Sequence, residues 1–242
     1  MEGNPVIELR EAQIFHSRDP YRKAGSRRGE LVLDGVNLRV GKGEMVYLIG
    51  RVGSGKSSLL KTLYAELPLC SGQGSIAGFD LRRLRRRDIP RLRRSIGVVF
   101  QDYRLLTDRN AYANLYYVMR ATGWRNDADT RRRIGEVLKL VGLENKAYRM
   151  PFELSGGEQQ RLSIARALVN SPGVILADEP TGNLDPAAAE EIIELFRRIV
   201  GRGCSIVMST HNISNIQQYP SRTIRFCRGG IEEIDIRSVL SF

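Results

Sequence analysis

The sequence is poor in cysteine, histidine and tryptophan, with three, two and one of each in 242 residues. Its cysteines, Cys70, Cys204 and Cys227, are too few and too widely spaced for a disulfide framework or a zinc site. We therefore expect three reduced and mostly buried thiols. No run of about 18 uncharged apolar residues is present, so we also expect no transmembrane helix.

The first five residues, Met1–Pro5, lack the basic start and apolar middle of a secretory signal peptide. Together with the reduced thiols, this predicts a cytoplasmic protein. The composition, 42% apolar with 24 glycines, suffices for one α/β domain or for one domain with an inserted lobe.

The formal net charge is +11, and much of it is concentrated in one segment. Such a segment can bind an anionic membrane surface or a nucleic acid, or it can be a solvated surface beside a negatively charged ligand site. Nucleic acid is the least favoured partner, because no aromatic residue for base stacking interrupts the run. The eight arginines occupy thirteen positions: Arg82, Arg83, Arg85, Arg86, Arg87, Arg91, Arg93 and Arg94.

Apolar runs and alternations predict strands, and apolar residues at helical spacing predict the helices between them. The expected strands cover residues 6–15, 31–40, 45–49, 96–100, 174–177, 205–208, 222–227 and 231–234. The expected helices cover residues 56–66, 110–143 without a break, 155–170 and a segment that begins after Asp185. Because the long helical segment interrupts the strand–helix alternation, we interpret it as an inserted lobe.

A glycine-rich turn follows the strand 45–49 and opens a helix, which is the setting of a phosphate-binding loop. Glycines free consecutive backbone N–H groups to face an anion, and the helix dipole adds to this attraction. Lys56 supplies a charge for the outer phosphates of a nucleotide, and Ser57 supplies a hydroxyl for Mg²⁺. The predicted loop comprises Gly50, Arg51, Val52, Gly53, Ser54, Gly55, Lys56, Ser57 and Ser58.

Polar residues follow three other expected strands. Asp178, at the end of a buried strand, can hold Mg²⁺, and Glu179 can orient or deprotonate an attacking water. Gln101 can reach the metal or the water with a neutral amide, although most isolated glutamines are surface residues. His211 follows a further strand and can contact the γ-phosphate, although an isolated histidine is more often structural.

A second candidate anion site lies at Ser155, Gly156, Gly157 and Glu158, where a helix is expected to begin. An ordinary helix cap, with Glu158 as the partner of Ser155, is the alternative interpretation. That alternative leaves the two adjacent glycines unexplained, since each is costly to order. The phosphate loop already fills this chain's own site, so the simplest use of the motif is to complete the γ-phosphate site of another subunit.

With these motifs in this order, the chain resembles the ATP-binding cassette family over almost its whole length. The motifs are the loop Gly50–Ser57, Gln101, the signature Leu154–Gln160, Asp178 with Glu179, the segment Gly182–Asp185 and His211. The resemblance implies one α/β P-loop domain with an N-terminal antiparallel β subdomain and an inserted α-helical lobe. The core would cover about residues 1–100 and 172–242, and the lobe about residues 102–171.

The resemblance also implies roles for these residues. Two copies would close head to tail over two ATP molecules, and Asp185 would belong to the segment between them. Glu179 would act as the general base, His211 would hold the γ-phosphate, and Gln101 would link Mg²⁺ to the lobe. An aromatic residue near the end of the first strand would stack on adenine; Phe15 is the nearest fit, with His16 and Tyr21 close by.

Within the family, residues 99–110 resemble the cell-division ATPases, whereas residues 177–185 are shared with lipoprotein-releasing and macrolide-export ATPases. The first likeness implies a subunit that drives an integral membrane partner from the inner face of the membrane. A transporter ATPase and a soluble nucleic-acid-associated ATPase remain the alternatives. The residues that could dock the partner, or could instead form the core of the lobe, are Leu105, Leu106, Tyr112, Tyr116 and Tyr117.

Overall fold

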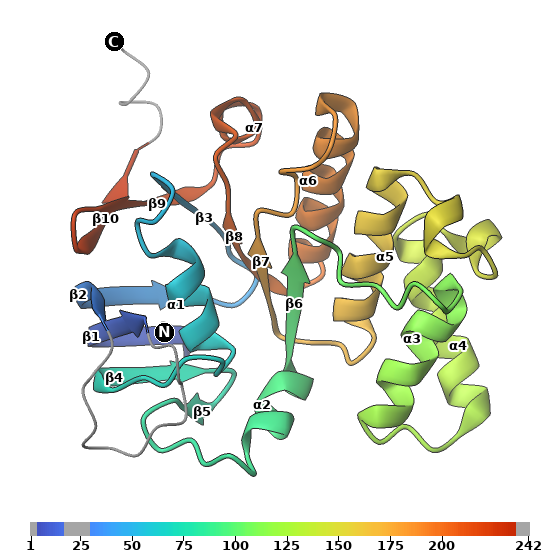
Figure 1. Cartoon of the computed structure of the whole chain (residues 1–242), viewed down its shortest axis with the longest axis horizontal. Coiled ribbons are helices and arrows are strands. Elements are labelled where there is room, and N and C mark those ends of the chain that lie inside the picture. Colours follow the sequence, from blue (N-terminus) through green and yellow to red (C-terminus); the bar gives the residue numbers. More distant parts are fainter. Residues whose placement is uncertain (1–3, 17–29, 236–242) are drawn as a thin grey trace.

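The computed structural model describes residues 4–16 and 30–235, and its centre is a sheet of six strands (Figure 1). The strand order is β10-β9-β3-β8-β7-β6, with β9 to β6 parallel and only β10 antiparallel to its neighbour. The expected strands of this sheet are confirmed with small changes at their ends. They are β3 (Met45–Gly50), β6 (Ile96–Phe100), β7 (Val174–Asp178), β8 (Ser205–Ser209), β9 (Arg222–Cys227) and β10 (Gly230–Ile234).

A second, antiparallel sheet has the order β2-β1-β4-β5. The sequence predicted β1 (Ile7–His16) and β2 (Glu30–Val40) but missed β4 (Ser71–Ile76) and β5 (Phe79–Asp80). In β4, two glycines replace the apolar residues by which a strand is recognised. A Cβ atom on Gly72 would lie 2.2 Å from the carbonyl oxygen of Glu11 in β1, so the close approach of these strands requires glycine.

The helices pack on both sides of the central sheet. In Figure 1, α5 lies between the sheet and the pair α3 and α4. The ranges are α1 (Lys56–Leu63), α2 (Ile89–Ser95), α3 (Ala111–Ala121), α4 (Asp127–Leu140), α5 (Gly156–Leu168), α6 (Pro186–Val200) and α7 (Ile213–Gln218), with short 3₁₀ turns at Glu144–Lys146 and Pro151–Glu153. The expected caps of α5 by Ser155 and of α6 by Asp185 are confirmed.

The expectation of one unbroken helix over residues 110–143 is wrong, because a turn separates α3 from α4. Gly123 in this turn has φ +103°, a backbone conformation that ends a helix. The indole Nε1 of Trp124 donates to Oδ1 of Asn170 at 3.0 Å, which anchors the turn to the end of α5. Asn126 then caps α4 by accepting from two backbone N–H groups. Apolar residues at helical spacing occur both before and after the turn. The sequence pattern therefore did not indicate that the helix is interrupted.

Two hydrophobic clusters lie on opposite faces of the central sheet. Met45, Tyr47 and Ile49 belong to the cluster beneath α3 to α6, whereas Val46 and Leu48 belong to the cluster beneath α1 and the antiparallel sheet. The first cluster continues from the sheet into α3 and α4, so the expected lobe shares a core with the expected nucleotide-binding part. Among the described residues, no helix combines the length and the apolarity needed to span a membrane.

The cysteines differ from the expectation of mostly buried thiols. Cys70 and Cys227 are exposed, and only Cys204 is partly buried; all three are free. Cys227 occupies an outward position of β9, where Ile224 and Phe226 point inward. Burial raises the pKa of the Cys204 thiol to about 11, so this group stays protonated at neutral pH.

One buried amide fixes the segment that follows β6. Asn114 of α3 is fully buried, and its Oδ1 accepts from the backbone N–H of Leu106 at 2.8 Å. Its Nδ2 lies within 3.1 Å of the carbonyl oxygens of Leu106, Arg109 and Asn110. A single buried side chain therefore bonds four backbone groups of residues 106, 109 and 110.

Replacing this amide tests its contribution to stability. Asn114→Ala leaves the N–H of Leu106 and the carbonyl oxygen of Arg109 without their partner and removes a fully buried side chain, and we expect it to lower the free energy of unfolding by about 3 kcal/mol. Urea denaturation followed by circular dichroism measures this change. The exposed Asn145→Ala serves as the control, with an expected change within about 0.5 kcal/mol. Equal effects of the two substitutions would contradict the role assigned to Asn114.

Candidate functional site

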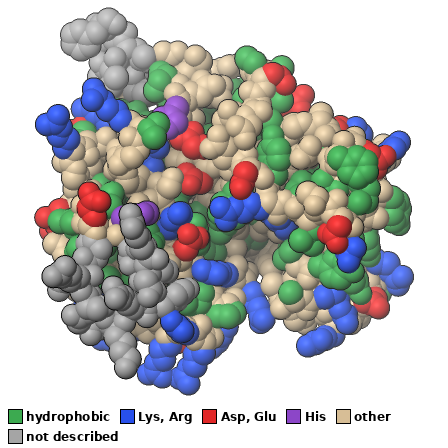
Figure 2. Space-filling view, in the orientation of Figure 1, with side chains coloured by type: hydrophobic (Ala, Val, Ile, Leu, Met, Phe, Trp, Pro, Cys, Tyr) green, Lys and Arg blue, Asp and Glu red, His purple; other side chains and the backbone are tan. Residues whose placement is uncertain are grey.

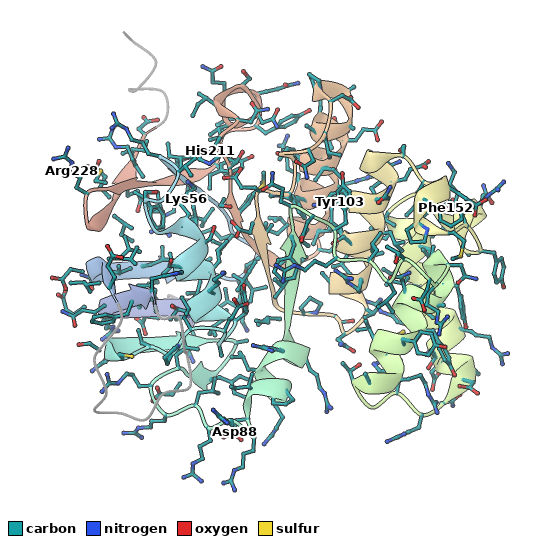
Figure 3. The ribbon with its side chains drawn as sticks, in the orientation of Figure 1. Lys56, Asp88, Tyr103, Phe152, His211 and Arg228 are labelled. Atoms are coloured by element: carbon teal, nitrogen blue, oxygen red, sulfur yellow. The ribbon has the colours of Figure 1, made fainter. Side chains whose placement is uncertain are left out.

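The residues predicted to carry chemistry meet at one edge of the central sheet. The phosphate loop follows β3, Gln101 follows β6, Glu179 follows β7, and His211 lies two residues beyond the end of β8. Parallel strands present their carboxyl ends at the same edge, which is where α/β sheets bind ligands. Figure 3 shows Lys56 and His211 close together at this edge.

The phosphate loop adopts a conformation that its glycines permit. Gly50 has φ +146°, and a Cβ there would lie 2.9 Å from the carbonyl oxygen of Phe226. Gly55 has φ +104° at the cap of α1, where a Cβ would meet Leu33 and Val32 of β2 at 2.9 Å. The antiparallel sheet therefore presses against the loop, and only glycine fits at these two positions.

A hollow lies beside this loop. Its lining consists of residues 53–58 of the loop and α1, with His16, Glu30, Leu31 and Val32 from the antiparallel sheet. The buried hydroxyl of Ser54 has no hydrogen-bond partner among the described residues. Since buried polar groups are normally satisfied, this hydroxyl is suited to a ligand such as a phosphate.

Lys56 is almost fully buried, and its ammonium group is held inside the loop. Its Nζ donates to the carbonyl oxygens of Gly50 at 2.8 Å and Arg51 at 3.2 Å. Burial lowers the pKa of Lys56, and the nearby carboxylates of Glu179 and Asp178 partly counter this effect. A phosphate placed beside the loop would therefore meet a positive charge that is already positioned.

Asp178 connects three elements of the site. Its Oδ1 accepts from the hydroxyl of Ser57 at 3.1 Å and from the hydroxyl of Ser209 at 2.7 Å. Ser209 in turn accepts from the backbone N–H of Glu179 at 2.9 Å. This chain ties α1 to β7 and β8. Sequence reasoning missed Ser209, whose only signal was its position at the end of a buried strand.

Glu179 and His211 form the next contact of the site. The Nε2 of His211 lies 2.9 Å from Oε1 of Glu179, a contact that is an ion pair when the imidazole is protonated. Burial raises the pKa of the Glu179 carboxyl; His211 and Lys56 lower it in part. Glu179 also has φ +48°, which is uncommon for a residue with a side chain and is typical of strained functional positions.

Gln101 is paired with a residue that the sequence analysis did not select as a site residue. Its Nε2 donates to Oδ1 of Asn183 at 3.1 Å, and Nδ2 of Asn183 donates to the carbonyl oxygen of Gln101 at 3.2 Å. A Cβ on Gly182 would lie 2.9 Å from Nε2 of Gln101, so glycine is needed beside the pair. Asn183 therefore sets the orientation of Gln101.

A buried arginine fixes the chain that leaves Gln101. Arg166 of α5 donates to the carbonyl oxygens of Tyr103, at 2.8 Å, and of Arg104. Both carbonyls belong to residues with positive φ, 56° and 51°. Burial lowers the pKa of the Arg166 guanidinium, though not enough to discharge a group of this type at neutral pH. Through these bonds the segment after β6 is held against α5.

The residues present fit a nucleotide and Mg²⁺. The candidate metal ligands, Ser57, Asp178 and Gln101, provide hard oxygen atoms around a second hollow, which Glu179 also lines. The described residues contain no cluster of three or more His, Cys, Asp or Glu side chains that could hold a metal alone. Mg²⁺ is usually bound by one or two protein side chains together with substrate phosphates.

The segment from Ser155 to Glu158 forms a complete capping box at the start of α5. The Oγ of Ser155 accepts from the N–H of Glu158 at 3.3 Å, and Glu158 accepts from the N–H of Ser155 at 2.9 Å. A hydrogen bond from Lys146 holds the pKa of Glu158 below its usual range. The neighbouring cap residue Asp185 accepts from the N–H of Ala188.

Close packing provides a second reason for the two glycines of this segment. A Cβ on Gly156 would lie 3.2 Å from the hydroxyl of Tyr103, and one on Gly157 would lie 3.1 Å from Cβ of Ala188. Ser155, Gly156, Gly157 and Glu158 line neither of the two hollows described above. The alternative of an ordinary cap thus holds for the backbone of α5, whereas the use of the segment by a second subunit stays a prediction.

The aromatic residue expected to stack on adenine does not line the hollow beside the phosphate loop. The side chain of Phe15 is buried, 9% exposed, and does not line the hollow beside the phosphate loop, whereas exposed His16 does. The geometry gives Phe15 no open ring face there, and its role stays a prediction. Tyr21 and the basic loop around it lie outside the described residues.

The five residues expected at the partner surface divide into two groups. Leu105, Tyr112 and Tyr116 pack against the core cluster, whereas Leu106 and Tyr117 are exposed. The structure adds two exposed aromatic residues that the sequence analysis did not select, Tyr148 and Phe152, at 80% and 77% exposure. In Figure 3, Phe152 lies at the outer side of the helical region, far from Lys56 and His211.

Comparisons with known proteins agree with this geometry. The family model described as ABC transporter matches residues 33–182. The cell division ATP-binding protein FtsE of Streptococcus pneumoniae is 45% identical over 90% of this chain and 94% of its own length. The proteins of the same name from Mycobacterium tuberculosis and Escherichia coli are each 44% identical, over 86% and 83% of this chain and 90% of their own lengths.

Solved structures show the same fold. The cbiO1 protein of Clostridium perfringens, part of an ABC transporter complex, superposes with a TM-score of 0.86 at 26% identity, covering 99% of this chain and 92% of that one. A dimeric bacterial ABC transporter cassette superposes with a TM-score of 0.80 at 32% identity, covering 96% of this chain and 99% of that one. The expected resemblance and fold class are confirmed: the chain belongs to the ABC transporter family and is an ATPase similar to the cell-division ATP-binding protein FtsE.

Proposed function

We propose that the chain hydrolyses ATP with Mg²⁺ as a head-to-tail homodimer, with each nucleotide held between two copies. The observation that carries this proposal is the position of the Ser155–Glu158 segment. It has the small residues and the helix start of an anion site, yet it lines neither hollow of its own chain. One relative of the same fold, whose dimeric structure has also been solved with ADP and phosphate bound, supports the arrangement.

In this proposal each residue of the sheet edge has one task. The phosphate loop and Lys56 hold the outer phosphates, and Glu179 accepts a proton from the attacking water at its carboxylate. His211, 2.9 Å from that carboxylate, orients it and reaches toward the γ-phosphate. When bound through Ser57, Asp178 and Gln101, Mg²⁺ neutralises charge on the phosphate oxygens. Asp185 and the partner's signature segment close the site.

We further propose that the dimer drives an integral membrane protein resembling FtsX, and thereby controls peptidoglycan hydrolases during cell division. Relatives named for cell division, 42–45% identical over most of the chain, support this role. The chain would act in the cytoplasm at the inner face of the membrane. The exposed residues Leu106 and Tyr117, beside the segment that carries Gln101, are the proposed docking surface.

The two other functions have less support. A lipoprotein-releasing or macrolide-export ATPase would share the same catalytic edge, but the similar curated proteins named above are cell-division ATPases. A nucleic-acid-associated ATPase rested on the net charge of +11 alone. Copurification of the chain with its membrane partner separates these functions, since a partner of the transporter type would point to export or release.

Substitution of the proposed base tests the composite site. Glu179→Gln keeps the size of the side chain but cannot take up the proton of the water, so ATP should persist between the subunits. We expect a stable dimer in size-exclusion chromatography with ATP and Mg²⁺, and a monomer with ADP. Combining Glu179→Gln with Ser155→Trp should restore the monomer, because Ser155 is exposed at the start of α5 and a bulky ring there would block the second anion site. A monomer of Glu179→Gln under ATP would contradict the proposal.

The pH dependence of hydrolysis tests the role of Glu179 in another way. Burial raises the pKa of this carboxyl, and bound phosphates raise it further by charge repulsion. Because the ionised form acts as the base, kcat should rise with pH through the raised pKa and be lost as the pH falls through it. The acid limb should therefore lie above the ordinary range of a glutamate. A limb in the ordinary range would argue against Glu179 as the base.

The pair of amides at Gln101 gives a further prediction. Asn183→Ala frees the Gln101 side chain, and we expect kcat to fall about tenfold, by analogy with the cost of other residues that orient a metal ligand. The Mg²⁺ concentration that half-saturates ATP-dependent dimer formation should rise, which a purely structural role would not cause. Asn145→Ala is the control for general effects of an amide loss. Unchanged Mg²⁺ dependence would remove the positioning role of Asn183.

A further inference from the structure

The arginine-rich segment, residues 82–94, lies at the edge of the molecule that faces away from the candidate site. Its helix α2 leads directly into β6, so it stands at the amino end of a strand whose carboxyl end carries Gln101. The five residues of β6 separate the two ends by roughly 16 Å. In Figure 3, Asp88, which precedes α2, lies at the lower edge, opposite Lys56 and His211. This position overturns the interpretation of a basic surface beside the ligand site.

Several of the arginines form hydrogen bonds or ion pairs with other residues of the chain. Arg93 donates to the carbonyl oxygens of Tyr64 and Ala65, which satisfies the end of α1. Arg83 pairs with Asp80, and Arg82 donates to the carbonyl oxygen of Cys70. These contacts explain part of the charge of the segment without any external partner.

Three other arginines make no such contacts with the described residues. Arg85, Arg87 and Arg91 are exposed, and no described residue forms a hydrogen bond or an ion pair with their side chains. They fall within seven positions, in the turn before α2 and in its first turn. Asp88 is the only acidic residue between positions 81 and 95. Figure 2 shows basic side chains gathered along this lower edge of the molecule.

An apolar hollow adjoins the free arginines. Leu84 and Ile89 of the arginine-rich segment are partly buried, and they line it together with the buried side chains of Leu67, Leu69 and Leu81. Glu66 also lines it, and its carboxylate is paired with Lys61. Arg86 lies in the wall of the same hollow. The surface thus places guanidinium groups, which bind phosphates, next to apolar side chains that favour a hydrocarbon environment.

We propose that this edge binds directly to an anionic lipid bilayer through Arg85, Arg87 and Arg91. The combination of charge and apolar surface fits phosphate headgroups lying above acyl chains. A nucleic acid would use the same charges, but its bases have no aromatic side chain to stack on in this segment. The proposal deepens the proposed function, because it adds to the membrane partner a contact made with lipid alone.

The test uses the purified full chain without any membrane partner. Flotation is measured with vesicles of phosphatidylcholine and phosphatidylglycerol, and with vesicles of phosphatidylcholine alone. We expect binding only to the anionic vesicles, and weaker binding as salt is added. Substituting all three arginines by serine should weaken the partitioning by roughly a hundredfold, since each basic residue at an anionic surface contributes about fivefold.

Two further variants serve as controls. Arg131→Ser, Arg202→Ser and Arg228→Ser together remove the same net charge from exposed positions elsewhere, and should change the partitioning only a few-fold. Figure 3 shows one of these, Arg228, at the opposite edge from Asp88. Replacing Arg85, Arg87 and Arg91 by lysine keeps the charge and should retain most of the binding.

Four outcomes would overturn the proposal. The first is that the unaltered chain does not float with anionic vesicles, and the second is that the two serine variants lose equal amounts of vesicle binding. The third is that inorganic phosphate, at the concentration of the lipid phosphate, displaces the chain from the vesicles. The fourth is that the variant with serine at positions 85, 87 and 91 loses binding to duplex DNA but still binds vesicles. The ATP-dependent dimer is measured on the same proteins. If a serine variant still forms the ATP-dependent dimer but no longer binds vesicles, the lipid-binding surface is distinct from the ATPase site. If the unaltered chain binds vesicles but forms no dimer with ATP, that result counts against the proposed function and not against lipid binding.

Discussion

The parallel register of β3, β8, β7 and β6 is the constraint on which the candidate site depends. Leu48 pairs with Ser209, Ser209 with Asp178, and Asp178 with Phe100, so the four strands end in one row. A shift by one residue would turn Asp178 to the other face of the sheet and break its bonds with both serine hydroxyls. The hydrophobic clusters on the two faces hold this register, because the apolar residues of the four strands alternate between them.

Polar contacts then convert this row of strand ends into a defined geometry. Asp178 joins α1 to β8, Asn183 orients Gln101, and Arg166 fastens the following segment to α5. The same segment is held from its other side by the buried amide of Asn114. The chain that leaves β6 is therefore fixed at both ends, and these contacts connect Gln101 to the helices α3 and α5.

The two ends of β6 serve different partners in the proposals made above. Its carboxyl end carries Gln101 toward the nucleotide, and its amino end carries the arginine-rich edge toward lipid. Since the strand is a short rigid element between the two, the orientation of the nucleotide site relative to a membrane would be set by the fold itself. In this arrangement the arginines at the amino end of β6 would bind lipid, because they lie too far from the nucleotide site to bind the nucleotide.

The sequence by itself determined the strands, the phosphate loop, the helix caps at Ser155 and Asp185 and the family, because these depend on local periodicity and on residue types at fixed spacings. It failed where a contact with distant residues decides. Trp124 anchors the turn between α3 and α4 through Asn170, the strand at Gly72 lies so close to β1 that only glycine fits there, and Asn183 meets Gln101 across 82 positions. Only the tertiary structure decided which arginines are free, since their neighbours come from α1 and from the antiparallel sheet, and no pattern along the chain reveals such neighbours.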